Sequence, residues 1–166
     1  IFVVGPTATG KTELSLQLAE HLNWPIINCD SVQVYKNVNI GTAKPSLQEY
    51  QRATHYLFDF VEPAEKFTVA EYLKAVVECL KVNNIKNAIF VGGSGFYIQA
   101  LEKGLYPESE TPLKVQKDVD KWVTEDGMES LYQWMQANDP FFAKKISPND
   151  HYRIRRAVEV MKTQNK

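Results

Sequence analysis

The stretch that decides the fold is Gly5-Pro6-Thr7-Ala8-Thr9-Gly10-Lys11-Thr12, which matches the pattern G-x-x-x-x-G-K-[ST] at every fixed position. An apolar run, residues 1–4, precedes it, and residues 12–22 carry leucines at helical spacing. A glycine turn between a buried strand and a helix directs backbone N–H groups toward phosphate oxygens, and the helix N-terminus adds partial positive charge. The stretch therefore predicts a P-loop that holds a diphosphate or triphosphate group.

The residue types of this loop predict its contacts. We expect the whole loop to bind the diphosphate or nucleotide, through Gly5, Pro6, Thr7, Ala8, Thr9, Gly10, Lys11 and Thr12. Lys11 supplies a mobile positive charge for the distal phosphate, and the Thr12 hydroxyl is placed to ligate Mg²⁺. The loop does not identify the reaction, because kinases, hydrolases and transferases all bind diphosphates in this way.

The following segments predict a parallel α/β sheet. Residues 25–29 and 87–91 are short apolar runs typical of buried strands, and residues 68–82 between them have helical period. Thr68 and Glu71 form the expected capping box of that helix. Alternating strands and helices favour a parallel sheet with right-handed crossovers. The fold class is therefore α/β, with a P-loop NTPase-like parallel sheet flanked by helices and a helical insertion domain.

The character of the sequence changes after residue 106. Two helical stretches, about 113–125 and 128–138, are separated by Asp126-Gly127, and a last helix follows Asp150. We expect three parts, which are a P-loop core over residues 1–106, a helical insertion over residues 107–146 and a helix over residues 147–166 that returns to the core.

Composition argues against several classes of protein. The net charge of -1 means that bulk electrostatics do not indicate nucleic-acid binding, so any basic surface must be local. No apolar run reaches membrane-spanning length. Cys29 and Cys79 form no Cys-x-x-Cys pair and fit core thiols of a cytosolic protein better than a zinc site or a disulfide. We expect a cytoplasmic protein, with an organelle as the alternative, and a monomer by default.

The ends of the second and third strands are where working residues are expected, since parallel sheets present them at their carboxyl ends. Asp30 follows the second strand and could orient a magnesium-bound water, accept a proton or cap a turn; position alone leaves these open. The third strand runs into Gly92-Gly93, where many nucleotide hydrolases carry an aspartate. This weighs against a motor or switch ATPase and favours close approach of another backbone or a bulky substrate.

Together these pieces resemble the tRNA dimethylallyltransferase family, also called tRNA isopentenyltransferases. The P-loop alone is generic, whereas Asp30-Ser31 and the segment 40–45 are close to diagnostic. The motifs occur in family order over nearly the whole chain: Asp30-Ser31 with Gln33 and Tyr35, Ile40-Gly41-Thr42-Ala43-Lys44-Pro45, His55 with Asp59 and Pro63, Gly92-Gly93-Ser94 with Tyr97, and Pro148-Asn149-Asp150 with Arg153, Arg156 and Glu159.

The resemblance implies transfer of a dimethylallyl group from dimethylallyl diphosphate to the exocyclic N6 amine of an adenosine adjacent to the tRNA anticodon. It implies a prenyl diphosphate on the P-loop, with Mg²⁺ as cofactor. Asp30 resembles the family's general base, and Thr7 the threonine that contacts the bridging oxygen of the leaving diphosphate. Lys11 would neutralise charge as diphosphate departs. A base is needed because the adenine amine is a poor nucleophile, and the target base must leave its stack to reach the site.

The resemblance also implies tRNA contacts, and the helical insertion looks like the family's domain that grips the anticodon arm. The candidate residues are Asp30, Ser31, Val32, Gln33, Lys44, Ser94, Tyr152, Arg153, Ile154, Arg155 and Arg156. Ser94 stands where threonine is more usual, and Val115 near where many members carry an arginine. The family continues beyond this C-terminus with a further arginine at the diphosphate, so we expect the chain to be part of a longer protein.

Two rival functions stay open on the sequence. A small-molecule or nucleotide kinase would share the P-loop, Asp30 and a pair of lid-like arginines, Arg153 and Arg156. The segment 40–45 and the helical insertion weigh against it. A nucleotide-dependent RNA-binding module without catalysis would share the fold but would have no catalytic use for Asp30.

Overall fold

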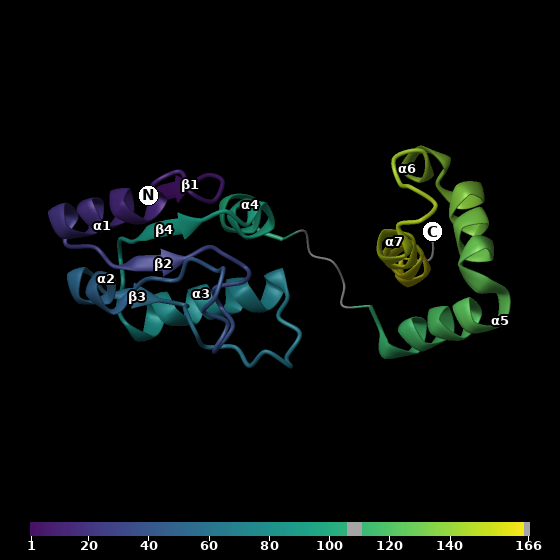
Figure 1. The fold of residues 1–166 in the computed structure, drawn as a ribbon. Helices are drawn as coiled ribbons and strands as arrows, with labels where there is room; N and C mark the ends of the chain where they lie inside the picture. The colour runs from purple at the N-terminus through teal and green to yellow at the C-terminus, as the bar shows by residue number, and fades with distance from the viewer. Residues whose placement is uncertain (106–110, 165–166) are drawn as a thin grey trace. The chain divides into compact units, whose positions relative to one another are not determined.

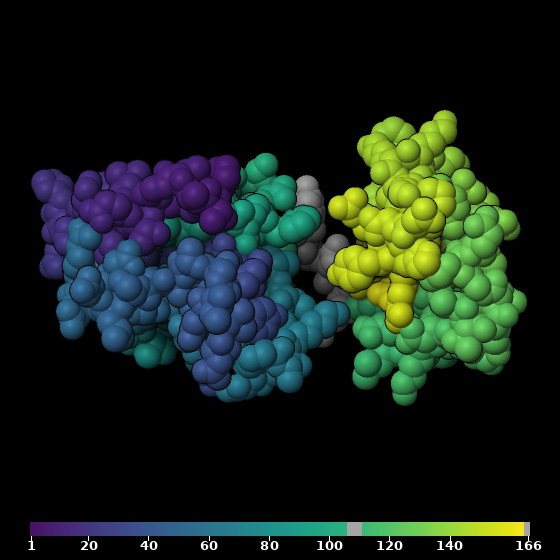
Figure 2. Space-filling view, in the orientation of Figure 1, coloured from purple at the N-terminus to yellow at the C-terminus, as the bar shows by residue number. Residues whose placement is uncertain are grey.

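The computed structural model describes residues 1–105 and 111–164. The chain divides into two compact units, Ile1–Leu105 and Tyr106–Lys166, each with its own hydrophobic core. Figure 1 shows the ribbon, and Figure 2 shows the same orientation as a space-filling surface, with the blue-violet chain between β2 and α2 at the front of the first unit.

The first unit is built on a four-stranded parallel sheet, as the alternating pattern predicts. Its strands are β1 (Phe2–Val4), β2 (Ile26–Asn28), β3 (His55–Tyr56) and β4 (Ile89–Gly92), in the spatial order β1-β4-β2-β3. In the register, β4 lies between β1 and β2, so that Val91 pairs with both Val3 and Asn28. The ends of β2 and β4 are therefore neighbours, which brings the residues that follow them together.

Helices cover the two faces of this sheet (Figure 1). On one face, α1 (Lys11–Leu22) packs Leu16 and Ala19 against Ile26 and Ile89. On the other face, α3 (Val69–Val82) and α4 (Gly95–Lys103) pack around Ile27. Successive residues of a strand point to opposite faces, so neighbouring positions of β2 serve two different cores.

The start of α3 confirms the predicted capping box. The Glu71 N–H donates to Thr68 Oγ1 at 3.3 Å, and the Thr68 N–H donates to Glu71 Oε2 at 2.6 Å. The same motif opens the short helix α2 (Leu47–Arg52), which the sequence pattern did not predict. Each reciprocal pair satisfies backbone donors that a helix start otherwise leaves unpaired.

The expectation that residues 1–4 form a strand buried on both faces is wrong. β1 lies at the edge of the sheet and pairs only with β4 in the described part of the chain. Val3 is buried under α1, whereas Phe2 and Val4 on the opposite face are 45% and 49% exposed. An apolar run indicates a strand, but it does not indicate how many neighbours that strand has.

The second unit is helical and comprises α5 (Leu113–Asn138), α6 (Pro140–Ala143) and α7 (His151–Thr163). Gly127, with φ of 81° and ψ of 168°, interrupts α5, which confirms the two helical stretches expected on either side of Asp126-Gly127. Trp122 Nε1 donates to Ser130 Oγ at 2.8 Å across this kink. The start of the predicted insertion, residues 107–110, lies outside the described residues.

The last helix, which was expected to return to the P-loop core, packs its apolar face within the helical unit. Ile154 and Val158 of α7 are fully buried in a cluster with Val119, Leu131 and Met135 of α5. The apolar face of α7 therefore completes the core of the helical unit, and α7 belongs to that unit. A helical pattern predicts a buried face without specifying the surface that covers it.

Candidate functional site

The P-loop connects β1 to α1 in the conformation that its glycines and small residues allow. Ala8 and Gly10 have positive φ values of 64° and 79°, and Gly10 is the N-cap of α1. Thr9 Oγ1 and Lys11 Nζ both donate to the carbonyl oxygen of Pro6, at 2.9 and 2.5 Å. These contacts fold the loop back on itself and keep the Lys11 ammonium at the N-terminal end of α1, where an anion is also favoured by the helix dipole.

A cavity of about 200 Å³ opens in front of this loop. Its polar side is formed by Thr7, Ala8, Thr9, Gly10, Lys11, Thr12 and Ser15, together with Asp30 and Gln33. Its other lining residues include Ile26, Ala43, Pro45, His55, Phe58 and Val91. The P-loop and Asp30 thus line one cavity, whose wall has both polar and apolar residues. Gly5 and Pro6, expected to bind phosphate, shape the loop but are not among the residues that line the cavity.

Asp30 uses one carboxylate oxygen to hold its own turn. Oδ1 accepts hydrogen bonds from the backbone N–H groups of Val32, at 2.9 Å, and Gln33, at 3.3 Å. No donor in the described residues bonds the second oxygen, Oδ2. The sequence position of Asp30 left turn capping and proton acceptance as alternatives. The two roles are compatible, because Oδ1 caps the turn while Oδ2 can accept a proton.

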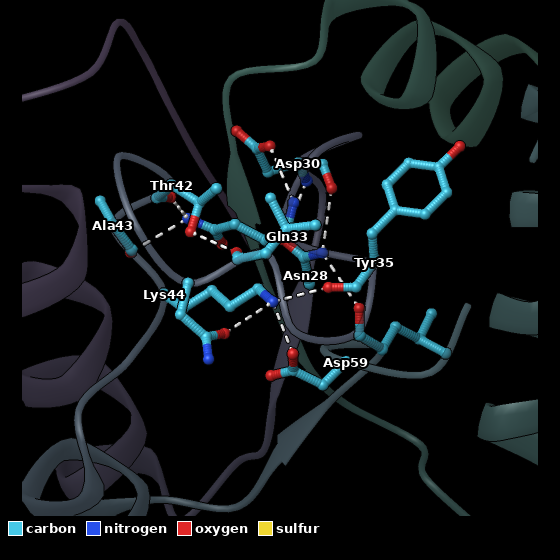
Figure 3. Close-up of polar contacts among 11 residues, drawn as sticks. Asn28, Asp30, Gln33, Tyr35, Thr42, Ala43, Lys44 and Asp59 are labelled. Carbon is cyan, nitrogen blue, oxygen red and sulfur yellow. Dashed lines mark hydrogen bonds and ion pairs between the residues drawn. The ribbon is translucent and has the colours of Figure 1, made fainter. Parts of the chain in front are cut away.

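Asn28 is a structural part of the site that the sequence analysis missed. Its side chain is fully buried; Oδ1 accepts from the Asp30 N–H at 2.9 Å, and Nδ2 donates to the carbonyl oxygens of Asp30 and Leu57 at 3.1 and 3.0 Å. These bonds fix the backbone of Asp30 against the segment after β3 (Figure 3). The available signal was an amide side chain inside the otherwise apolar run 26–29.

The glycines after β4 are explained by the close approach of β2, as the absence of an aspartate there led us to expect. A Cβ atom on Gly92 would lie 2.2 Å from the carbonyl oxygen of Cys29, and one on Gly93 would lie 3.2 Å from the carbonyl oxygen of Gly5. Ser94 then joins the two strand ends, because its Oγ accepts from the Ser31 N–H at 2.7 Å and donates to Ser31 Oγ at 3.0 Å. Ser31 and Ser94, two of the expected tRNA contacts, are thus brought together beside Asp30.

Gln33 and Lys44, two of the expected tRNA contacts, donate from their side-chain nitrogens to acceptors within the sheet unit. Gln33 Nε2 donates to the carbonyl oxygens of Thr42 and Ala43 at 2.7 and 3.0 Å. The side chain of Lys44 is only 6% exposed, and its ammonium pairs with Asp59 at 2.5 Å (Figure 3). Both side chains therefore hold the segment 42–45, which forms part of the cavity wall.

Three aromatic rings pack together beside the cavity, and two of them, His55 and Phe58, line it. The His55 ring lies edge-on to Tyr50 and Phe58, with centroid distances of 4.9 and 5.6 Å. His55 Nδ1 lies 2.8 Å from the carbonyl oxygen of Ala53. Burial lowers the pKa of His55, so the neutral imidazole is favoured and this part of the cavity wall stays weakly polar.

Buried side chains support the site from beneath β2. The Tyr72 hydroxyl donates to the carbonyl oxygen of Asn28 at 2.8 Å and lies 3.0 Å from Cys29 Sγ, and its ring stacks on Tyr97 at 3.8 Å. Burial raises the pKa of the Cys29 thiol to about 12. Cys29 is therefore an uncharged core residue and not a nucleophile, in agreement with the expected core thiol.

The remaining expected contacts lie on α7, in the second unit. Tyr152 is 73% exposed, and the exposed Arg153 makes one local ion pair with Asp150 at 3.4 Å. Ile154, another expected tRNA contact, has its side chain fully buried in the helical core. Val32, in the first unit, is 47% exposed.

Arg155 and Arg156 both contact other residues of the helical unit. Arg155 Nε lies 3.1 Å from Glu159, and its guanidinium also pairs with Asp120. Arg156 Nη1 donates to Thr111 Oγ1 at 2.5 Å and lies 3.4 Å from Glu159. These pairs hold the two arginines in place, so Tyr152 and Arg153 are the more open part of the helix.

The donor set fits a magnesium ion that is shared with a diphosphate. Within residues 1–105 and 111–164, no three His, Cys, Asp or Glu side chains gather as a metal site. Thr12 and Asp30 do line the same cavity. Since Mg²⁺ usually keeps several waters and binds through one or two protein oxygens plus substrate phosphates, this sparse set is sufficient.

Among the described residues, no helix combines the length and the hydropathy that a membrane-spanning segment needs. A larger hollow, of about 490 Å³, lies on the outer side of α3 and is lined by Leu73, Lys74, Val77, Glu78, Lys81 and Val82. It contains no part of the P-loop, so the functional site is assigned to the cavity beside Asp30.

Comparison with known proteins agrees with this geometry. The family model described as IPP transferase matches residues 33–166. The tRNA dimethylallyltransferase of Bdellovibrio bacteriovorus is 45% identical to this chain, and the match covers 100% of this chain and 54% of that relative. The tRNA dimethylallyltransferase of Halothermothrix orenii is 42% identical, and the match covers 96% of this chain and 50% of that relative. The chain spans about half the length of the curated relatives that it matches.

Solved structures give the same assignment. The tRNA isopentenylpyrophosphate transferase from Bacillus halodurans is 32% identical over 97% of this chain and 54% of its own, with a TM-score of 0.58. A eukaryotic dimethylallyltransferase described as acting on tRNA is 27% identical over 99% of this chain and 42% of its own, with a TM-score of 0.84. With a P-loop α/β sheet, an aspartate in the phosphate cavity and these matches, the chain belongs to the IPP transferase family.

Proposed function

We propose that the protein containing this chain transfers a dimethylallyl group from dimethylallyl diphosphate to the exocyclic N6 amine of an adenosine beside the anticodon of a tRNA. The observation that carries the proposal is that Asp30 and the P-loop line one cavity. Relatives of this chain are tRNA dimethylallyltransferases, which favours prenyl transfer over the kinase alternative.

The polar and the apolar residues of the cavity wall suit the two ends of the donor. The diphosphate would bind the backbone N–H groups of the P-loop and the Lys11 ammonium, at the N-terminus of α1. The five-carbon chain would lie against Ile26, Pro45 and Phe58, which are apolar residues of the wall. When bound there, Mg²⁺ with Thr12 as a ligand would neutralise part of the diphosphate charge.

The chemistry then needs one proton acceptor and one stabilised leaving group. The N6 nitrogen forms a bond to the first carbon of the prenyl group while the bond from that carbon to the diphosphate oxygen breaks. Asp30, whose Oδ2 has no donor in the described residues, would take the proton from N6. Lys11 and the Thr7 hydroxyl would stabilise the negative charge that develops on the leaving diphosphate.

The acceptor is proposed to be the anticodon stem-loop of a tRNA, with the target adenine turned out of its stack. Val32 is exposed next to Asp30, at the edge of the site, and Tyr152 and Arg153 are exposed on the helical unit. An aromatic ring and a guanidinium suit stacking and phosphate contact with an RNA loop. A cytoplasmic location and a monomeric state stay predictions.

Incubation of the full-length protein with dimethylallyl diphosphate and unmodified tRNA, without ATP, tests the proposal. Mass spectrometry of the digested tRNA should show an adenosine heavier by one dimethylallyl group, and only when the diphosphate is present. ATP-dependent phosphorylation of a small molecule, with no prenylated adenosine, would support the kinase alternative and overturn the proposal.

A further inference from the structure

Residues 42–45, which we call the wall segment, form one side of the cavity. Thr42, Ala43 and Pro45 line it, whereas Lys44 does not. The segment belongs to no helix or strand, so its position depends on side-chain contacts that reach it from elsewhere. The Thr42 hydroxyl donates to the carbonyl oxygen of Val38 at 2.9 Å, and the longer-range contacts are made by Lys44 with Asp59 and by Gln33 with Thr42 and Ala43.

Lys44 is anchored by three acceptors. Its Nζ donates to the carbonyl oxygen of Tyr35 at 2.6 Å, to Asn39 Oδ1 at 3.2 Å and to Asp59 Oδ1 at 2.5 Å (Figure 3). An ammonium has three N–H donors, so these bonds use all of them. With its side chain 6% exposed, Lys44 has no donor left for a phosphate.

Gln33 holds the same segment from inside the site. Its amide nitrogen donates to the carbonyl oxygens of Thr42 and Ala43, the second of which is a residue with the left-handed φ of 51°. A non-glycine residue keeps such a backbone conformation only where its surroundings fix it. The Gln33 carbonyl accepts from the Asp59 N–H at 3.2 Å, and its own N–H donates to Asp30 Oδ1, so the network reaches the proposed base.

We infer that Lys44, together with Gln33 and Asp59, is a positioning residue that fixes the wall segment and thereby determines which prenyl chain the cavity accepts. The inference rests on the proposed function and deepens it. Ala43 and Pro45 present small, rigid surfaces to the cavity, and a wall held by five hydrogen bonds from Lys44 and Gln33 cannot withdraw to admit a longer chain. Lys44 acts through the wall, without touching tRNA.

The test compares Lys44→Met with the matched control Lys36→Met in the full-length protein. Both changes remove one lysine charge, but Lys36 pairs with Glu62 at 2.6 Å on the surface and is not a lining residue of the cavity. Gln33→Met, which loosens the same wall without changing charge, is the second variant. Circular dichroism melting shows whether each variant is folded.

Isothermal titration calorimetry without tRNA measures the affinity for each ligand, so it reports the effect of the wall segment on binding independently of catalysis. The three ligands are inorganic diphosphate, dimethylallyl diphosphate and the ten-carbon geranyl diphosphate. Inorganic diphosphate should bind all proteins alike, because it needs the P-loop only. The preference for the five-carbon over the ten-carbon ligand should fall about tenfold in Lys44→Met and in Gln33→Met, in the range that hydrophobic pockets achieve by shape, and stay unchanged in Lys36→Met.

A tRNA-binding assay at two salt concentrations separates this role from phosphate contact. Lys44→Met should keep the wild-type tRNA affinity and its salt dependence. A salt slope reduced by about one would make Lys44 a phosphate contact and overturn the inference. Unchanged chain-length preference in both folded variants would also overturn it. If the wild-type protein binds inorganic diphosphate but neither prenyl diphosphate, the proposed function itself fails.

Discussion

At the scale of single residues, the environment of Asp30 shows how a loop carboxylate is held in one orientation. Asn28 bonds the Asp30 backbone on both sides, and the N–H groups of Val32 and Gln33 occupy Oδ1. The rotamer of the carboxylate is therefore determined by the turn, and Oδ2 is left for a substrate. Preorganisation of this kind avoids the cost of orienting a catalytic group during the reaction.

Asn28→Ala should lower both stability and activity. The change leaves the part-buried Asp30 N–H and Leu57 carbonyl without the buried amide that bonds them, so we expect a loss of about 2 kcal/mol in the free energy of unfolding. Urea denaturation measures it. The control is Asn138→Ala, whose exposed side chain makes one bond to the Trp134 carbonyl and whose loss should cost under about 0.5 kcal/mol. Equal losses in the two variants would contradict the role given to Asn28.

His55 should make stability depend on pH. Its pKa is lowered by burial in the folded protein, so below the unfolded value of 6.5 the unfolded chain binds more protons than the native state. Stability from neutral His55 is therefore present above that value and is lost as pH falls through the folded pKa. Wild type should lose more stability than His55→Phe between about pH 7.5 and about pH 5.5, because the two proteins differ only in this side chain. An identical pH dependence of the two melting temperatures would refute this.

Much of the site could be predicted at this scale, but not the direction of every side chain. The P-loop could be predicted because its residues form a motif of fixed local spacing. Asp30 could be predicted because the carboxyl ends of parallel strands meet at one edge of the sheet. Gln33 and Lys44 were expected to contact tRNA, and the partners that their side-chain nitrogens bond, Thr42, Ala43 and Asp59, lie 9, 10 and 15 residues away in sequence. Contacts of this kind depend on how a loop folds, which residue spacing does not encode.

At the scale of elements, the junction of β2 and β4 determines where the loops meet. Gly92 lets β4 approach Cys29 so closely that the residues after both strands form one surface. Ser94 then bonds Ser31 directly. Gly92 and Gly93 therefore allow neighbouring backbone segments to approach closely, whereas Ser31 and Ser94 link the loops that border the cavity.

Gly92→Ala should be destabilising, and Gly95→Ala should not. A Cβ added to Gly92 would lie 2.2 Å from a backbone carbonyl oxygen, which forces the strands apart and should cost about 3 kcal/mol or more. Gly95 begins α4 with open space around its Cα, so alanine there should be neutral or stabilising by up to about 1 kcal/mol. Chemical denaturation of the two variants compares them. A Gly92→Ala protein as stable as wild type would contradict the close approach of β4 to Cys29.

The elements that the sequence predicted are those with strong local signals. The capping box of α3 and the glycine kink of α5 are each encoded within a few residues. The missed elements lack such signals: α2 has six residues and buries none of them, β3 has two residues, and α4 starts among glycines. The edge position of β1 depends on strand order, which no single segment encodes.

At the scale of the whole molecule, the two units divide the proposed work. The sheet unit contains the cavity with the P-loop and Asp30, and the helical unit presents Tyr152 and Arg153. A net charge of -1 is consistent with local rather than bulk attraction of RNA. The sequence predicted a separate helical part. The amphipathic pattern of α7 did not indicate that its apolar face packs against α5.

The proposed reaction depends most on Asp30 as the proton acceptor opposite a diphosphate. The direct measurement is single-turnover prenyl transfer by Asp30→Ala in the full-length protein, with donor and tRNA affinities measured in parallel. We predict a rate lowered roughly a hundredfold or more, with both affinities close to wild type, because a general base acts in the transition state. An unchanged rate at saturating donor and tRNA would contradict the central claim.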